Sequence, residues 1–133
     1  MRYFKKFNDL EWKSPSYENS TKENSFVLKK VLVHKPTFVK DKDLQFVNWS
    51  QLDAGKSITA HYHTNLDEII ICLSGDAHVK IESDEIYKMD AGSVIHVEPG
   101  EVHDIVAGKD IFVYVTIGFK PSEEPEGKTF KAD

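Results

Sequence analysis

Two histidines and a glutamate have spacings that suit a metal site. His61 and His63 lie two positions apart in a short run of β-branched and aromatic residues. Side chains two positions apart in a strand face the same side, so both imidazoles point to one surface. After a short turn, Glu68 opens an apolar run in which it shares a face with Ile70 and Cys72. A carboxylate there is costly to bury unless a cation neutralises it.

A third segment supplies a further ligand. His103 follows the turn Pro99-Gly100 and begins another β-branched run. Three imidazoles and one carboxylate suit Fe(II), Mn(II), Ni(II), Co(II) or Zn(II). One ligand charge leaves a divalent ion with a net positive charge of about one, and an octahedral ion keeps open positions for substrate. We therefore predict one open metal centre, of the kind that catalyses reactions, at His61, His63, Glu68 and His103.

Other polar residues near these segments have competing interpretations. Asp67 is an alternative ligand, but the strand phase favours Glu68 and gives Asp67 a role in the turn. Cys72 and His96 are pocket candidates, because each shares a strand face that can line the interior. A free cysteine is more often a small core residue, and His96 can equally point to solvent. His78 alternates with apolar residues and is expected to be exposed.

Many short strands must position these residues. β-branched and aromatic runs recur along the chain, and turn residues such as Ser74-Gly75 and Ala91-Gly92 separate many of them. The runs cover residues 26–28, 31–33, 38–39, 44–49, 58–63, 68–73, 77–81, 94–97, 102–106 and 111–117. This pattern, with no long helical period, predicts an all-β sandwich or barrel. We place the barrel at 26–118, between an N-terminal arm (1–25) and a C-terminal tail (119–133).

The bulk composition restricts the classes of function. The 133 residues fit a single domain. A formal net charge of −5 argues against a nucleic-acid partner and against docking to an anionic membrane. The single cysteine, Cys72, rules out an intramolecular disulfide. No apolar run approaches the roughly 20 residues of a membrane span and no secretion signal develops, so we expect a cytoplasmic protein.

The spacing of these residues resembles that of the cupin family. The first cupin motif is matched at every fixed position, by Gly55, His61, His63, Glu68 and Gly75. Residues 92–103 resemble the second motif, although Glu98 stands where the family often has proline. The resemblance extends over roughly 26–118 and implies a double-stranded β-helix, or jelly-roll, barrel. It also implies a homodimer, often formed by exchange of an N-terminal strand, for which residues 27–33 are the candidate.

The resemblance does not select one reaction, because cupins include dioxygenases, sugar isomerases, decarboxylases and non-catalytic binders. No nucleotide or flavin motif is present, so the metal would carry the chemistry, with Glu68 as a candidate base. Arg2 is the sole arginine, which disfavours a phosphosugar or di-acid site unless a lysine replaces the usual clamp. We expect a metal-dependent enzyme for a small oxygen-rich molecule, first of all a dioxygenase. The alternatives are a redox-neutral sugar or uronate isomerase and a small-molecule-binding protein without turnover.

Overall fold

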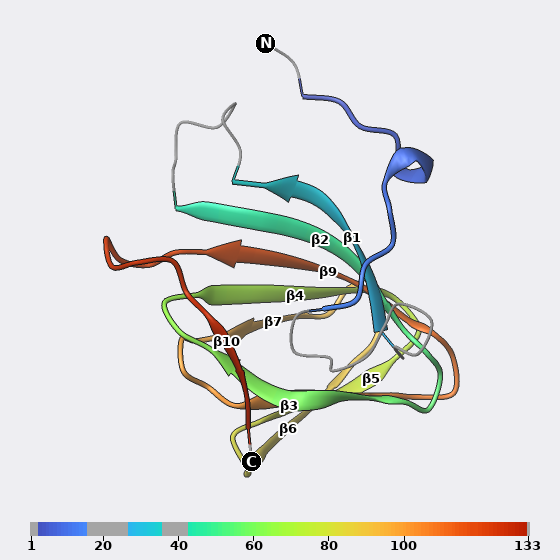
Figure 1. Ribbon diagram of the computed structural model, residues 1–133. Coiled ribbons are helices and arrows are strands. Elements are labelled where there is room, and N and C mark those ends of the chain that lie inside the picture. Colours follow the sequence, from blue (N-terminus) through green and yellow to red (C-terminus); the bar gives the residue numbers. More distant parts are fainter. Residues whose placement is uncertain (1–2, 16–26, 36–42, 133) are drawn as a thin grey trace.

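Two antiparallel five-stranded sheets face each other in the computed structural model, which describes residues 3–15, 27–35 and 43–132 (Figure 1). Sheet A has the order β1-β2-β9-β4-β7, and sheet B has the order β10-β3-β8-β5-β6. The strands are β1 (Val27–His34), β2 (Leu44–Leu52), β3 (Ser57–His63), β4 (Asp67–Ser74), β5 (Ala77–Ile81), β6 (Glu85–Met89), β7 (Val94–Val97), β8 (His103–Ala107), β9 (Phe112–Phe119) and β10 (Thr129–Lys131). The predicted all-β class is confirmed.

Helical structure in the described part of the chain is limited to the 3₁₀ turn η1 (Phe7–Asp9). No helix there is long and apolar enough to cross a membrane.

Alternating burial along the strands creates the interior. In β4 the buried positions are Glu68, Ile70 and Cys72, as the strand phase predicted. In β9 every second residue from Phe112 onward is buried. The register places Leu52 beside Phe112 at one end of sheet A and Glu68 beside Gly118 at the other. The interior therefore has an apolar end and an end that contains the glutamate.

Two strands were not apparent in the sequence. Four of the five residues of β6 are exposed, and β6 is an edge strand of sheet B, so its sequence lacks the alternation of a half-buried strand. The strand β10 has only three residues and comes from the segment expected to be a surface tail. Two expected runs, 26–28 and 31–33, contribute to the single strand β1, while residue 26 and the run 38–39 lie outside the described residues.

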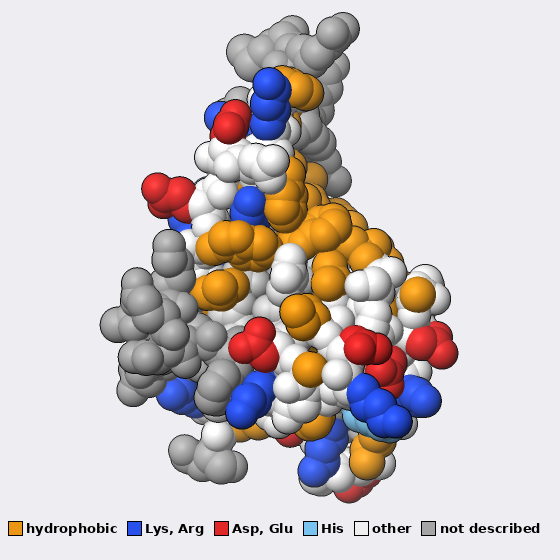
Figure 2. All heavy atoms as spheres, turned by 90° about the vertical axis from the view of Figure 1, so that its right-hand side faces the viewer, with side chains coloured by type: hydrophobic (Ala, Val, Ile, Leu, Met, Phe, Trp, Pro, Cys, Tyr) orange, Lys and Arg blue, Asp and Glu red, His pale blue; other side chains and the backbone are white. Residues whose placement is uncertain are grey.

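The N-terminal arm packs against the outer face of sheet A through Lys30. The Nζ atom of Lys30 donates a hydrogen bond to the carbonyl of Phe7 (2.8 Å) and lies 3.8 Å from the centre of the Phe7 ring. Trp49, opposite Lys30 in the register, contacts Phe7 edge to face. Hydrophobic side chains gather near the arm in Figure 2. Lys30 is therefore on the outer face of sheet A. Because successive side chains in a strand point to opposite faces, the neighbouring Lys29 points into the barrel.

Candidate metal centre and cavity

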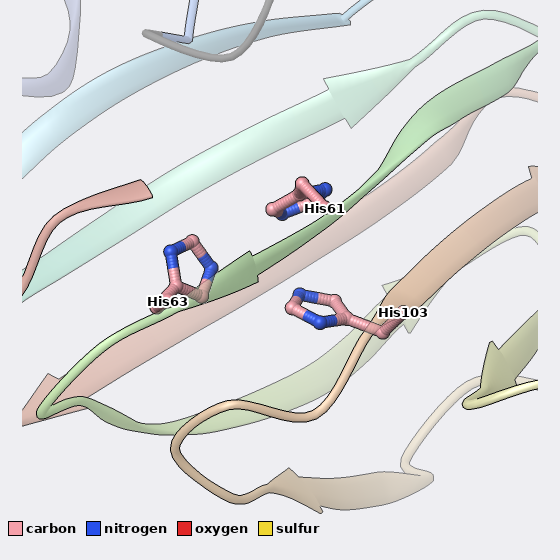
Figure 3. Close-up of side chains that lie close together, drawn as sticks. All are labelled: His61, His63 and His103. Carbon is pink, nitrogen blue, oxygen red and sulfur yellow. The ribbon is translucent and has the colours of Figure 1, made fainter. Parts of the chain in front are cut away.

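Three histidines from two neighbouring strands point toward one another inside the barrel (Figure 3). One ring nitrogen from each of His61, His63 and His103 lies within 4.8 Å of the others. The His61 and His103 ring centres are 4.3 Å apart. The register explains this proximity, because β3 and β8 are adjacent and His61 lies directly opposite His103. Residues from two separate motifs thus form one cluster.

Hydrogen bonds fix the orientation of the rings. The Nδ1 atom of His61 donates to the carbonyl of Thr59 (2.7 Å), and Nδ1 of His103 donates to the carbonyl of Glu101 (2.9 Å). A carbonyl only accepts, so Nδ1 carries a proton in both rings, and in the neutral form of each ring Nε2 keeps its lone pair. The buried Nε2 atoms of His63 and His103 have no hydrogen-bond partner among the described residues. Orphaned acceptors oriented in this way fit a metal ion.

Glu68 reaches the cluster from the opposite sheet. Its Oε1 lies 3.6 Å from Nε2 of His103 and 3.9 Å from Nε2 of His63, and the residue is only 8% exposed. Metal bonds of about 2.1 Å place neighbouring ligand atoms about 3 Å apart and opposite ones about 4 Å apart. The glutamate is therefore close to two of the histidines, but the group whose ligand atoms all lie within 4.8 Å of one another contains only His61, His63 and His103 among the described residues, so Glu68 as the fourth ligand stays a prediction. Asp67, the alternative ligand, points away and pairs with His96.

The electrostatics of the cluster favour cation binding. Burial alone would raise the pKa of Glu68, but the adjacent His103, followed by His63 and His61, lowers it to about 2. Burial, reinforced by His103, lowers the pKa of His61 to about 4, and burial also lowers the pKa of His63. Burial would lower the pKa of His103 too, but Glu68 outweighs it and the net shift is upward. At neutral pH, His61 and His63 are therefore neutral and Glu68 is ionised, the forms that bind metal.

The cluster lines a cavity of about 330 Å³, which is at the lower end of the range for small-molecule sites. Sheet A contributes Lys29 from β1, Asn48 and Ser50 from β2, and Tyr114 and Thr116 from β9. These residues were not among the predicted site residues. Their strands carried the expected alternation, but only the packed structure shows which interior positions open onto the cavity.

The C-terminal segment forms one side of this cavity. Thr129 of β10 places Oγ1 2.8 Å from Nδ1 of His63 and so holds the third imidazole. The side chain of Asn65, in the loop after β3, donates to two carbonyls of this segment (3.1 and 3.0 Å). A Cβ atom on Gly127 would collide with the carbonyl oxygen of Thr64, so the close approach requires glycine. The segment expected to be a tail is part of the site.

Neither Cys72 nor His96 lines the cavity. Cys72 is 1% exposed and belongs to the hydrophobic core, where burial raises the pKa of its thiol. The expectation that His96 could line the interior needs correction: the alternation in β7 buries Val97 and turns His96 outward, away from this cavity, and 51% of its side chain is exposed. Its Nε2 lies 2.6 Å from Oδ1 of Asp67. His78 is exposed, as expected.

Comparisons with known proteins agree with this architecture. A family model for the cupin domain matches residues 48–118. The polyketide cyclase RemF from Streptomyces resistomycificus superposes with a TM-score of 0.75 at 15% identity, covering 100% of this chain and 88% of RemF. KdgF from a Halomonas species superposes with a TM-score of 0.70 at 18% identity, covering 92% of this chain and 97% of KdgF. A Klebsiella pneumoniae protein with a double-stranded β-helix domain gives 0.69 at 17% identity, covering 100% and 99%.

At these identities the structural matches establish the fold alone, and they confirm the predicted double-stranded β-helix barrel. No curated protein matches the sequence.

Proposed function

The chain belongs to the cupin family, and we propose that it is a metal-dependent enzyme acting on a small oxygen-rich molecule. The observation that carries the proposal is the pair of orphaned Nε2 atoms on His63 and His103, which face Glu68 at the wall of the cavity. The ion would be a divalent transition metal (Fe, Mn, Ni, Co or Zn) held by His61, His63, Glu68 and His103. When bound, it would polarise a substrate oxygen and, if redox-active, activate dioxygen.

The chain's own residues would hold and shield the substrate. Ile58, Ile70 and Ile105 give the cavity apolar surfaces that exclude water. Lys29 adds a positive charge on the sheet A side. A carboxylate with a pKa of about 2 is a weak base, so the environment of Glu68 favours the role of ligand over that of general base.

Dioxygenase-type oxidation is the first reaction to test, because a site of three histidines and one glutamate suits Fe(II) and Mn(II). A redox-neutral reaction is the second candidate. Lys29 supports it, since a half-buried ammonium that lines the cavity can stabilise negative charge that develops on a substrate without any oxidant. The fold relative RemF, described as a polyketide cyclase, is in keeping with this alternative.

The decisive experiment is elemental analysis of protein purified without chelator. We expect about one equivalent of transition metal in the wild type and none in a His61→Ala, His63→Ala double variant. His78→Ala is the matched control, because this exposed histidine lies on β5 outside the cavity, and it should keep the full metal content. A wild type that holds no metal even after reconstitution would contradict the proposal.

Oxygen uptake then separates the reaction classes. Consumption of dioxygen by the metal-loaded wild type in the presence of small hydroxy acids or sugars, absent in the double variant, would support oxidation. Conversion of substrate without oxygen uptake would assign a redox-neutral enzyme. Tight binding with no conversion would identify a binding protein.

We also propose a homodimer. β1 is an edge strand of sheet A: β2 pairs with one side, and on the other side Lys29 forms a single bridge with Lys13 of the N-terminal arm (2.8 and 2.9 Å). A sheet edge is a common place for a second chain to add its backbone hydrogen bonds. Sedimentation equilibrium at twice the 15.2 kDa chain mass would support the dimer, and a single-chain mass at micromolar concentration would contradict it.

A further inference from the structure

Lys29 places an ammonium group in the cavity, where the proposed metal site has no use for it. It points inward from β1, opposite Ser50 of β2, and lines the cavity together with His63 and Glu68. Among the described residues no carboxylate lies within ion-pair distance of its Nζ. Burial lowers the pKa of Lys29, and the charge of Glu68 only partly opposes that shift. Lys29 is half-buried, and a counter-charge at its ammonium would offset the cost of this partial desolvation.

Asn48 lies on the same wall and also lacks a partner. The residue is 7% exposed, and its buried Oδ1 has no hydrogen bond within the part of the chain that the structure describes. Ser50 and Thr116 are also buried and line the same cavity. The register puts Lys29 beside Ser50 and Asn48 beside Thr116. The buried Oδ1 of Asn48 is costly in a barrel interior unless a ligand donates a hydrogen bond to it.

The net charge of the cavity indicates the charge of that ligand. A divalent ion together with ionised Glu68 has a net charge of about plus one, and Lys29 raises the total to about plus two. Glu126 also lines the cavity, but its carboxylate is engaged by Lys35 at 2.5 Å and about half exposed. A ligand with two negative charges would neutralise the site.

We propose that the substrate is a small hydroxy-dicarboxylate, an assignment that rests on the proposed function. One carboxylate and the hydroxyl belong at the metal end, the second carboxylate pairs with Lys29, and the hydroxyl proton is donated to Oδ1 of Asn48. A single ammonium matches the one charge of a carboxylate, whereas a phosphate group usually gathers several donors. The lysine thus takes the place of the arginine clamp that the sequence lacks.

Calorimetric titration of the zinc-loaded protein tests this assignment with matched pairs of probes. Malate is compared with 2-hydroxybutyrate, and 2-hydroxyglutarate with 2-hydroxyvalerate, so that each pair differs only in its distal carboxylate. We expect at least one dicarboxylate to bind about tenfold or more tightly than its partner. The preference should vanish in Lys29→Met, return in part in Lys29→Arg and persist in Lys80→Met, an exposed lysine on β5.

Zinc content of the same samples separates this assignment from the metal proposal. A fully loaded wild type that binds the members of both pairs equally would overturn the assignment and leave the metal centre standing. Loss of zinc from Lys29→Met would also overturn it, because Lys29 would then serve the metal site. Tighter binding of 3-phosphoglycerate than of either dicarboxylate would overturn the choice of carboxylate. A wild type that cannot be loaded with zinc would end both proposals.

Discussion

The two ends of the barrel interior are built by the same strands but have opposite chemistry. At the apolar end, Leu52 of β2 and Phe112 of β9 are completely buried and pack in the hydrophobic core. Toward the end that contains Glu68, the same two strands carry Asn48 and Thr116, and both of these residues line the cavity. In β2 and β9, the fully buried apolar residues and the polar residues of the cavity therefore lie toward different ends of the strand. This division predicts that stability and metal binding can be changed independently.

The largest effect is expected from Phe112→Ala at the apolar end. Phe112 is fully buried and stacks on Tyr114 with ring centres 4.7 Å apart. Its truncation should lower the free energy of unfolding by about 3–5 kcal/mol, measured by urea denaturation. The folded variant should still bind about one equivalent of metal. Ile86→Ala, at a position 63% exposed, is the control and should have little effect. Loss of metal from the folded Phe112→Ala variant would show that stability and metal binding cannot be changed independently.

The second prediction concerns the loss of folding stability at low pH that follows from burying imidazoles at the end that contains Glu68. The pKa of His61 is about 4 in the folded metal-free protein against an ordinary value of 6.5, so the unfolded chain takes up a proton first as pH falls. Stability should therefore fall between pH 7 and pH 5, by about 2 kcal/mol from this group. Urea unfolding of EDTA-treated protein should show that extra loss in the wild type but not in His61→Gln. Equal losses of stability in the wild type and in His61→Gln would show that the loss does not come from His61.

A smaller effect is expected at the boundary between the cavity and β10. Thr129→Val removes the hydroxyl that holds His63 while keeping the size of the side chain. Metal affinity should fall about tenfold, because partners of metal-bound histidines typically contribute that much. Competition with a chromogenic chelator measures the change, and Thr129→Ser should restore most of the affinity. Unchanged affinity in the valine variant would mean that β10 only covers the site.

The smallest effect is expected outside the barrel. His96→Gln removes the exposed contact with Asp67, and surface ion pairs contribute at most about 1 kcal/mol. Thermal denaturation should shift little, and metal content should stay unchanged. A large loss of metal in this variant would show that the outer face supports the site, contrary to the comparison.

Local periodicity explains what could be predicted from the sequence. The two-residue period of a strand was enough to put His61 and His63 on one face and to bury Glu68 with Ile70. The same rule did not decide which face of β7 is buried, and the structure shows that His96 lies on the outward face.

Contacts between distant segments could not be predicted in this way. Lys29 and Lys30 are adjacent in an apolar strand, and the packing of Phe7 on Lys30 shows that Lys29 faces inward. Thr129 reaches His63 across 66 positions of sequence through a strand of only three residues. Such a short segment has too few residues for a detectable hydrophobic period.

The hydrogen bond between Thr129 and His63 also sets an order of events during synthesis. At about 5–20 residues per second, a ribosome needs roughly 3–13 s to add the 66 positions between them. During that interval the nascent chain presents the first two histidines while the ring of His63 is not yet held. The cluster of three oriented histidines is therefore complete only after the residues of β10 have been added.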